Sequence, residues 1–214
     1  LLTKNKDIPG DGHWVDDPDI VDFPPGSVLP KHFAFWRRPK TSLFSISPPG
    51  HPNTLRISPS RVNLTADAAF QPLVDGLAFV ARKQSATLFD YSVDVSFNPK
   101  VADEEAGISV FLTQLQHIDL GIVNLPDKHT GNFVPTLRFR VEASGKPNTT
   151  VPDTNLFSLP RSWLKGPIRL SVSAKKDDTY VFSAAPASKP REVKVVGEAS
   201  VGIVSGGSGP FTGQ

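Results

Sequence analysis

Three adjacent carboxylates, Asp103, Glu104 and Glu105, stand directly before the apolar run AGISVF. Two such groups can break a glycosidic bond when they face each other across roughly 5–10 Å. The preceding FNPKVA is typical of a turn, however, and neighbouring residues of a turn point in different directions. We therefore interpret the triplet as a solvated acidic turn. Calcium binding is the alternative, because hard oxygen ligands gather in such loops, but no D-x-D-x-D-G motif supports it.

Other residue types that could support chemistry are sparse. The histidines show neither H-x-x-x-H nor H-x-E spacing, so a zinc site is not predicted. They stand at positions 13, 32, 51, 117 and 129. Cysteine is absent, which excludes disulfides and thiolate ligands. No G-x-S-x-G motif is present, and SGGSGP at 205–210 lacks the lysine of a phosphate-binding loop. We expect no cofactor and no metal.

Charge and hydrophobicity narrow the class of protein. The 214 residues carry 23 Lys and Arg against 21 Asp and Glu, a net charge of +2. This near balance does not fit a dedicated nucleic-acid or membrane-surface binder, which concentrates basic charge on one face. No apolar run approaches the roughly 20 residues of a membrane span. The hydrophobic content of 38% is enough for one well-filled core.

Alternating polar and apolar residues predict the elements that must position these side chains. YSVDVSF at 91–97, LRFRVEA at 137–143 and IRLSVSA at 168–174 have the period of two typical of half-buried strands. Further strands are predicted at 43–46, 53–58, 76–83, 107–113, 117–124, 179–184 and 192–204. No stretch has a helical pattern. The sequence therefore predicts an all-β, two-sheet antiparallel sandwich, favoured over a closed barrel.

The N-terminal region has a different character. Residues 1–34 are rich in Pro, Gly and Asp, so we expect an irregular linker or arm there, followed by the sandwich at 35–214. Trp14, Phe23 and Trp36 are large aromatics suited to burial at a domain interface. The chain begins without Met, and we interpret it as a piece of a longer protein.

Two sequons are present, at Asn63 and Asn148, both in turn-like contexts. They are candidate glycan sites if the protein passes through a eukaryotic secretory route. A sequon is common by chance at this length, so each alone is weak support for export. The two sequons, together with the family resemblance that the motifs below carry, lead us to expect a secreted, extracellular protein.

Several segments occur together in one order: FWRRP, SPPGHPNTLRISPSRVNLT, LAFVARKQSATLFDYSVDVSFNP, EEAGISVFL, IRLSVSAKKDDTYVFS and GPFTG. As a set, the chain resembles the C-terminal concanavalin A-like β-sandwich, a jelly roll, of glycoside hydrolase family 43, the β-xylosidase and α-arabinofuranosidase group. Fungal members look most similar. The resemblance implies that the catalytic carboxylates lie on a five-bladed propeller ahead of the sandwich, and that this chain by itself does not cleave glycosides.

The resemblance also implies a role for the sandwich. It would pack against the propeller, and one loop would help to close the pocket for xylan-derived substrates. The loop GSGPFTG makes Phe211 the candidate residue. Comparable sandwiches continue into one more strand pair beyond FTGQ, so we expect the last strands to be missing.

Two other functions stay open on the sequence. A freestanding carbohydrate-binding module or lectin would stack aromatic rings on xylan or xylo-oligosaccharide, and Trp163 in PRSWLKGP is the candidate for that contact. A buried core tryptophan is the alternative interpretation of Trp163. The chain could also be an interaction domain that makes no sugar contact.

Overall fold

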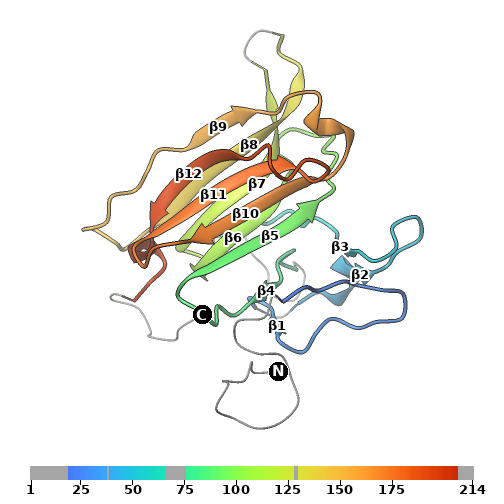
Figure 1. The fold of residues 1–214 in the computed structure, drawn as a ribbon, viewed down its shortest axis with the longest axis horizontal. Coiled ribbons are helices and arrows are strands. Elements are labelled where there is room, and N and C mark those ends of the chain that lie inside the picture. The colour runs from blue at the N-terminus through green and yellow to red at the C-terminus, as the bar shows by residue number, and fades with distance from the viewer. Residues whose placement is uncertain (1–18, 38, 66–75, 128–129, 207–214) are drawn as a thin grey trace. The chain divides into compact units, whose positions relative to one another are not determined.

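The computed structural model describes residues 19–37, 39–65, 76–127 and 130–206. It divides into two compact units, residues 1–83 and residues 84–214, which are considered separately. Its described elements are strands joined by turns, with three short 3-10 helices (Figure 1). None of the described helices has the length and apolar character needed to cross a membrane.

The second unit contains two four-stranded antiparallel sheets (Figure 1). Sheet A has the order β12-β11-β10-β5, and sheet B has the order β6-β7-β8-β9. The strands of sheet A are β5 (Phe89–Val95), β10 (Ile168–Ala174), β11 (Thr179–Pro186) and β12 (Lys194–Ser200). The strands of sheet B are β6 (Glu105–Thr113), β7 (Gln116–Pro126), β8 (Phe133–Ala143) and β9 (Asn155–Ser158). This architecture confirms the predicted all-β sandwich.

Period-two patterning explains how the two sheets form one core. Strand β10 alternates strictly between buried and partly buried residues, and its apolar side chains face inward. Phe139 of sheet B meets Phe182 of sheet A with ring centroids 5.5 Å apart. The core is completed beside the strands by the 3-10 helices η2 (Trp163–Lys165) and η3 (Val201–Ile203), through Trp163 and Ile203.

Two further contacts hold the sheets together on the β12 side. Gly197 of β12 lies so close to Phe139 that an added Cβ would stand 2.3 Å from the ring carbon Cδ1. The Asn155 side-chain amide of β9 donates a hydrogen bond of 2.6 Å to the carbonyl of Val196. A glycine is needed at 197 because the opposing ring occupies the place of a side chain.

Strand β5 ends sheet A on the opposite side. Its Tyr91 and Val93 lie opposite Val172 and Leu170, on the face that is apolar in the neighbouring strand. They are nevertheless 47% and 36% exposed. The sandwich is therefore less well covered along β5 than at its centre.

The first unit contains shorter elements. These are β1 (Phe33–Ala34), η1 (Thr41–Leu43), β2 (Phe44–Ile46), β3 (Leu55–Ile57) and β4 (Ala81–Arg82). Strand β1 pairs with β4, and β2 pairs with β3. Leu77 is buried in a small cluster with Trp36, Val62, Leu64 and Phe79. The described part of the predicted arm, residues 19–34, has turns and ends in the two-residue strand β1.

The strand predictions are correct where alternation is strong and wrong in four places. The prediction at 76–83 yields only the two-residue β4. Strands β1 and β9 were not predicted, because neither has an alternating pattern. The predicted strand 192–204 ends at Ser200, where that hydroxyl accepts the backbone N–H of Gly202 and begins a 3-10 turn. The predicted division at residue 34 stays a prediction.

Candidate functional site

The acidic triplet is split among different partners. Asp103 adopts a left-handed backbone conformation with φ of 61°. Glu104 Oε2 accepts the backbone N–H groups of Lys100 at 2.5 Å and Val101 at 3.0 Å. These hydrogen bonds from Lys100 and Val101 lower the pKa of Glu104. Glu104 therefore closes the turn, as the sequence predicts.

Glu105 differs from its predicted place. It is the first residue of β6, and its carboxylate forms a two-pronged ion pair with Arg138 of β8, at 2.6 Å and 3.2 Å. Arg140 Nη2 lies 3.5 Å from the same carboxylate. The interpretation of the whole triplet as a solvated turn is thus wrong for Glu105. Arg138 stands 33 residues later in the sequence, and the pairing of β6, β7 and β8 brings it beside Glu105.

A second carboxylate, Asp119 of β7, lies on the same polar face of sheet B. It is 6% exposed and accepts a hydrogen bond from Arg140 Nε at 3.1 Å. His117 Nδ1 stands 3.0 Å from both Asp119 oxygens, so this nitrogen is the donor to an ionised Asp119. Burial alone would raise the pKa of Asp119. The His117 hydrogen bond and the nearby Arg140 charge outweigh burial, and the pKa is lowered.

The ion pairs of Glu105 and Asp119 limit the acid-base chemistry that these two carboxylates can perform. A general acid needs a raised pKa so that it carries a proton at neutral pH. Asp119 has a lowered pKa, and Glu105 is held in a two-pronged ion pair by Arg138. Among the described residues, no group of three His, Cys, Asp or Glu side chains could hold a metal ion. The polar face of sheet B thus carries a network of ion pairs in which Arg138 and Arg140 engage both carboxylates.

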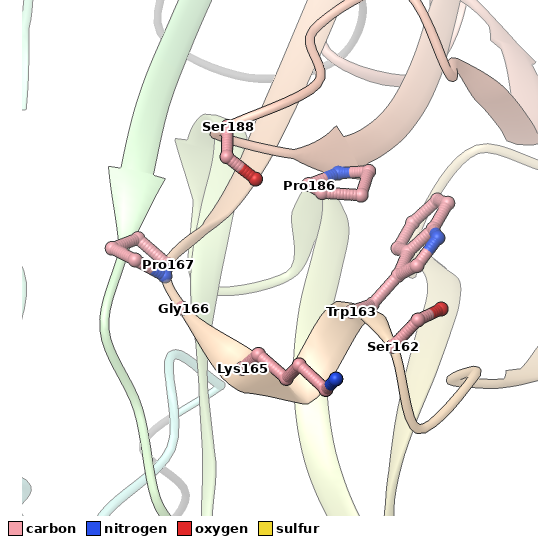
Figure 2. A pocket seen from close by; sticks show the side chains of 7 residues that line it. All are labelled: Ser162, Trp163, Lys165, Gly166, Pro167, Pro186 and Ser188. Atoms are coloured by element: carbon pink, nitrogen blue, oxygen red, sulfur yellow. The ribbon is translucent and has the colours of Figure 1, made fainter.

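A small pocket lies beside η2 (Figure 2). Its free volume is about 130 Å³. The lining residues are Ser162, Trp163, Lys165, Gly166, Pro167, Pro186 and Ser188. Trp163 is only 8% exposed and packs on Phe157 with ring centroids 6.2 Å apart. Trp163 is therefore a core residue that also forms one wall of a pocket, and its contact with sugar stays a prediction.

The remaining predicted residues lie elsewhere. Phe23 packs near Phe33 with ring centroids 6.3 Å apart, and Trp36 contacts the Leu77 cluster, so both serve the first unit. Trp14 and Phe211 lie outside the described residues. The predicted interface roles of Trp14, Phe23 and Trp36 and the predicted pocket role of Phe211 stay predictions.

Both predicted glycosylation sites lie at the surface. Asn63 and Asn148 are exposed, and Asn148 lies in a turn, where a glycan could be attached.

Sequence reasoning missed both the Glu105–Arg138 pair and the pocket position of Lys165. Alternation placed Arg138 on a polar face, but the pairing depends on strand order and register.

Comparison with known proteins gives the chain its family. Residues 21–214 match the family model of the β-xylosidase C-terminal concanavalin A-like domain of the GH43 group. A curated relative, the non-reducing end α-L-arabinofuranosidase BoGH43B of Bacteroides ovatus, is 29% identical over 203 residues, which cover 94% of this chain and 34% of the relative.

Solved structures agree on the fold. The GH43 protein BlXynB from Bacillus licheniformis, in a mutant form, aligns with a TM-score of 0.66 at 17% identity, covering 86% of this chain and 31% of that one. Its unmutated form gives a TM-score of 0.64 at 17% identity, with coverage of 83% and 30%. The chain thus spans about a third of the length of these relatives. Both source organisms are bacteria, and a fungal source stays a prediction.

Taken with the two-sheet sandwich, the match over most of the sequence shows that the chain belongs to the family of β-xylosidase C-terminal concanavalin A-like domains of GH43 proteins.

Proposed function

We propose that this domain braces the catalytic propeller of a GH43 glycosidase that acts on xylan-derived β-xylosides or arabinosides. The observation that carries the proposal is the match to a C-terminal domain whose relatives are about three times as long. The arginine-paired carboxylates of sheet B support the non-catalytic part of the proposal. Alone, the chain should not cleave glycosides.

The bracing role can be tested by adding this chain to the separately produced propeller of the parent protein. Binding to the folded propeller stabilises it by about 2.7 kcal/mol at a concentration one hundred times the dissociation constant. We expect the two parts to elute together and the melting temperature of the propeller to rise by several degrees. Separate elution with an unchanged melting temperature would contradict bracing.

A second part of the proposal concerns Phe211. By resemblance to the family, its loop would help to close the substrate pocket of the propeller. Replacing Phe211 with Ala in the intact enzyme should raise KM for short xylo-oligosaccharides. Phe133→Ala, at an exposed phenylalanine at the start of β8, is the matched control and should leave KM unchanged. An unchanged KM in Phe211→Ala would refute this role.

The freestanding module makes a different prediction. It requires the isolated chain to bind xylan or xylo-oligosaccharides through an exposed aromatic platform. The low exposure of Trp163 weighs against that platform. Titration of the isolated chain with xylohexaose, compared between the native chain and Trp163→Phe, separates the two functions.

We also propose that the protein is secreted and carries glycans. The exposure of Asn63 and Asn148 supports this proposal. Treatment of the natural protein with an endoglycosidase should increase its electrophoretic mobility, and unaltered mobility would argue against glycans at either site.

A further inference from the structure

The pocket beside η2 is built by two segments that the sheet brings together. One segment runs from Ser162 to Pro167 and leads into β10, and the other begins at Pro186, the last residue of β11. Ile168 pairs with Pro186 in the sheet, and the Ala187 N–H donates to the Pro167 carbonyl at 3.0 Å. Regular strand pairing therefore fixes both walls, so the pocket is a stable feature of the fold.

The polar side chains that line this pocket are hydrogen-bond donors, and none of them is acidic. Lys165, Ser162 and Ser188 are exposed, and no Asp or Glu is among the lining residues. Figure 2 shows the Ser188 hydroxyl pointing into the space between Pro167 and Pro186. Within the described ranges, no hydrogen bond or ion pair engages the Lys165 ammonium. A ligand with a negative charge and several hydroxyls would satisfy these groups.

The remaining lining is apolar. The exposed ring of Pro167 offers a C–H surface to a ligand, and the largely buried Pro186 and Trp163 form the base of the pocket (Figure 2). Gly166 leaves room among them, because a Cβ added there would meet no atom within 4 Å. A pyranose has the matching character, with C–H groups on its faces and hydroxyls around its rim.

Size limits the ligand to one ring. Pockets for drug-sized molecules have volumes of roughly 300–1,000 Å³. The 130 Å³ available here suits an end group or a branch, and not a run of a polysaccharide chain.

We propose that this pocket binds a single carboxylate-bearing pyranose, a uronic acid of the kind that branches acidic hemicelluloses. The Lys165 ammonium pairs with the carboxylate, the Ser162 and Ser188 hydroxyls bind ring hydroxyls, and the proline rings support the sugar face. The proposal rests on the proposed function only for the choice of hemicellulose as the source of the sugar.

Titration of the full chain, followed by NMR chemical shifts at low salt, tests the proposal with three probes. Sodium D-glucuronate should bind in the millimolar range, with shifts confined to the two pocket segments. Methyl β-D-xyloside lacks the charge and should bind at least threefold more weakly. Sodium acetate lacks the ring and should bind at least tenfold more weakly. Equal binding of the xyloside or of acetate would overturn the proposal.

Matched variants locate the binding. Lys165→Gln should weaken glucuronate binding roughly three- to fivefold, which is the upper part of the range for an exposed ion pair. Lys176→Gln removes the same charge from an exposed turn and should have no effect. Gly166→Val fills the open space on an extended backbone and should abolish binding while the chain stays folded.

Two results would overturn the assignment: full affinity in Gly166→Val, or no saturable binding of glucuronate to the native chain. Neither result bears on bracing, because that function is measured by elution and propeller melting. The two proposals can therefore fail independently.

Discussion

Replacing Gly197 with alanine is the sharpest test of how the two sheets pack. The added methyl would stand 2.3 Å, 2.4 Å and 2.6 Å from three ring carbons of Phe139. Carbon atoms in good contact lie about 3.5–4.0 Å apart, so the ring must retreat by more than about 1 Å. It has little room to do so, because Phe139 is buried and already contacts Phe182.

The expected cost follows from this overlap. Overpacking a filled core destabilises by about 1–3 kcal/mol, and a methyl driven against a ring places the cost near the upper end. Replacing a glycine inside a strand with alanine by itself stabilises the folded state by about 0.5–1 kcal/mol. We therefore expect Gly197→Ala to lower the free energy of unfolding by about 2 kcal/mol, measured by urea denaturation. Gly166→Ala, where nothing stands within 4 Å, is the control and should change it by less than about 0.5 kcal/mol.

A double-mutant cycle decides whether the clash with Phe139 is the cause. Phe139→Leu removes the ring atoms that the methyl meets, so the double variant should be more stable than the sum of the two single effects implies, by about 1 kcal/mol or more. Additive effects would refute the reasoning, as would a loss below about 0.5 kcal/mol for Gly197→Ala.

Two further predictions concern polar groups. Asp119→Asn should lower the free energy of unfolding by about 3 kcal/mol at pH 7, because His117 and Arg140 lose their buried partner. The lowered pKa of Asp119 stabilises the fold above the unfolded-state pKa, and this contribution is lost as the pH falls through the folded-state pKa. The difference between native and variant should therefore shrink between pH 5 and pH 3, and a constant difference would contradict the pairing. Asn155→Ala should cost about 1 kcal/mol in urea denaturation, because the carbonyl of Val196 loses its donor; no loss would show that the bond contributes nothing.

Alternation made most of the sandwich predictable from the sequence. IRLSVSA gives β10 at the predicted bounds, because a strand with one buried face needs a side chain of the right kind at every second position. A short strand has too few positions to show this alternation. Strand β9, Asn155–Ser158, has only four residues at a sheet edge, and its place depends on its pairing with β8.

The candidate sites were less predictable because they depend on contacts between distant residues. LRFRVEA shows that Arg138 lies on a polar face, but only the sheet order brings Glu105 beside it. The pocket likewise joins Lys165 to Ser188 through the pairing of β10 with β11. Trp163 could be read as a core residue or as a sugar contact, and three-dimensional packing was needed to show its burial.

The poorly covered edge strand β5 has a consequence for solubility. An edge strand with exposed apolar side chains invites pairing with another chain, and charged residues oppose that pairing. Asp90 and Asp94 place charged side chains along this edge, where Asp94 pairs with Arg169 of β10 and Asp90 pairs with Lys175, the residue after β10. We therefore expect these two aspartates to oppose edge-to-edge pairing of β5, from the face of the strand opposite to Tyr91 and Val93.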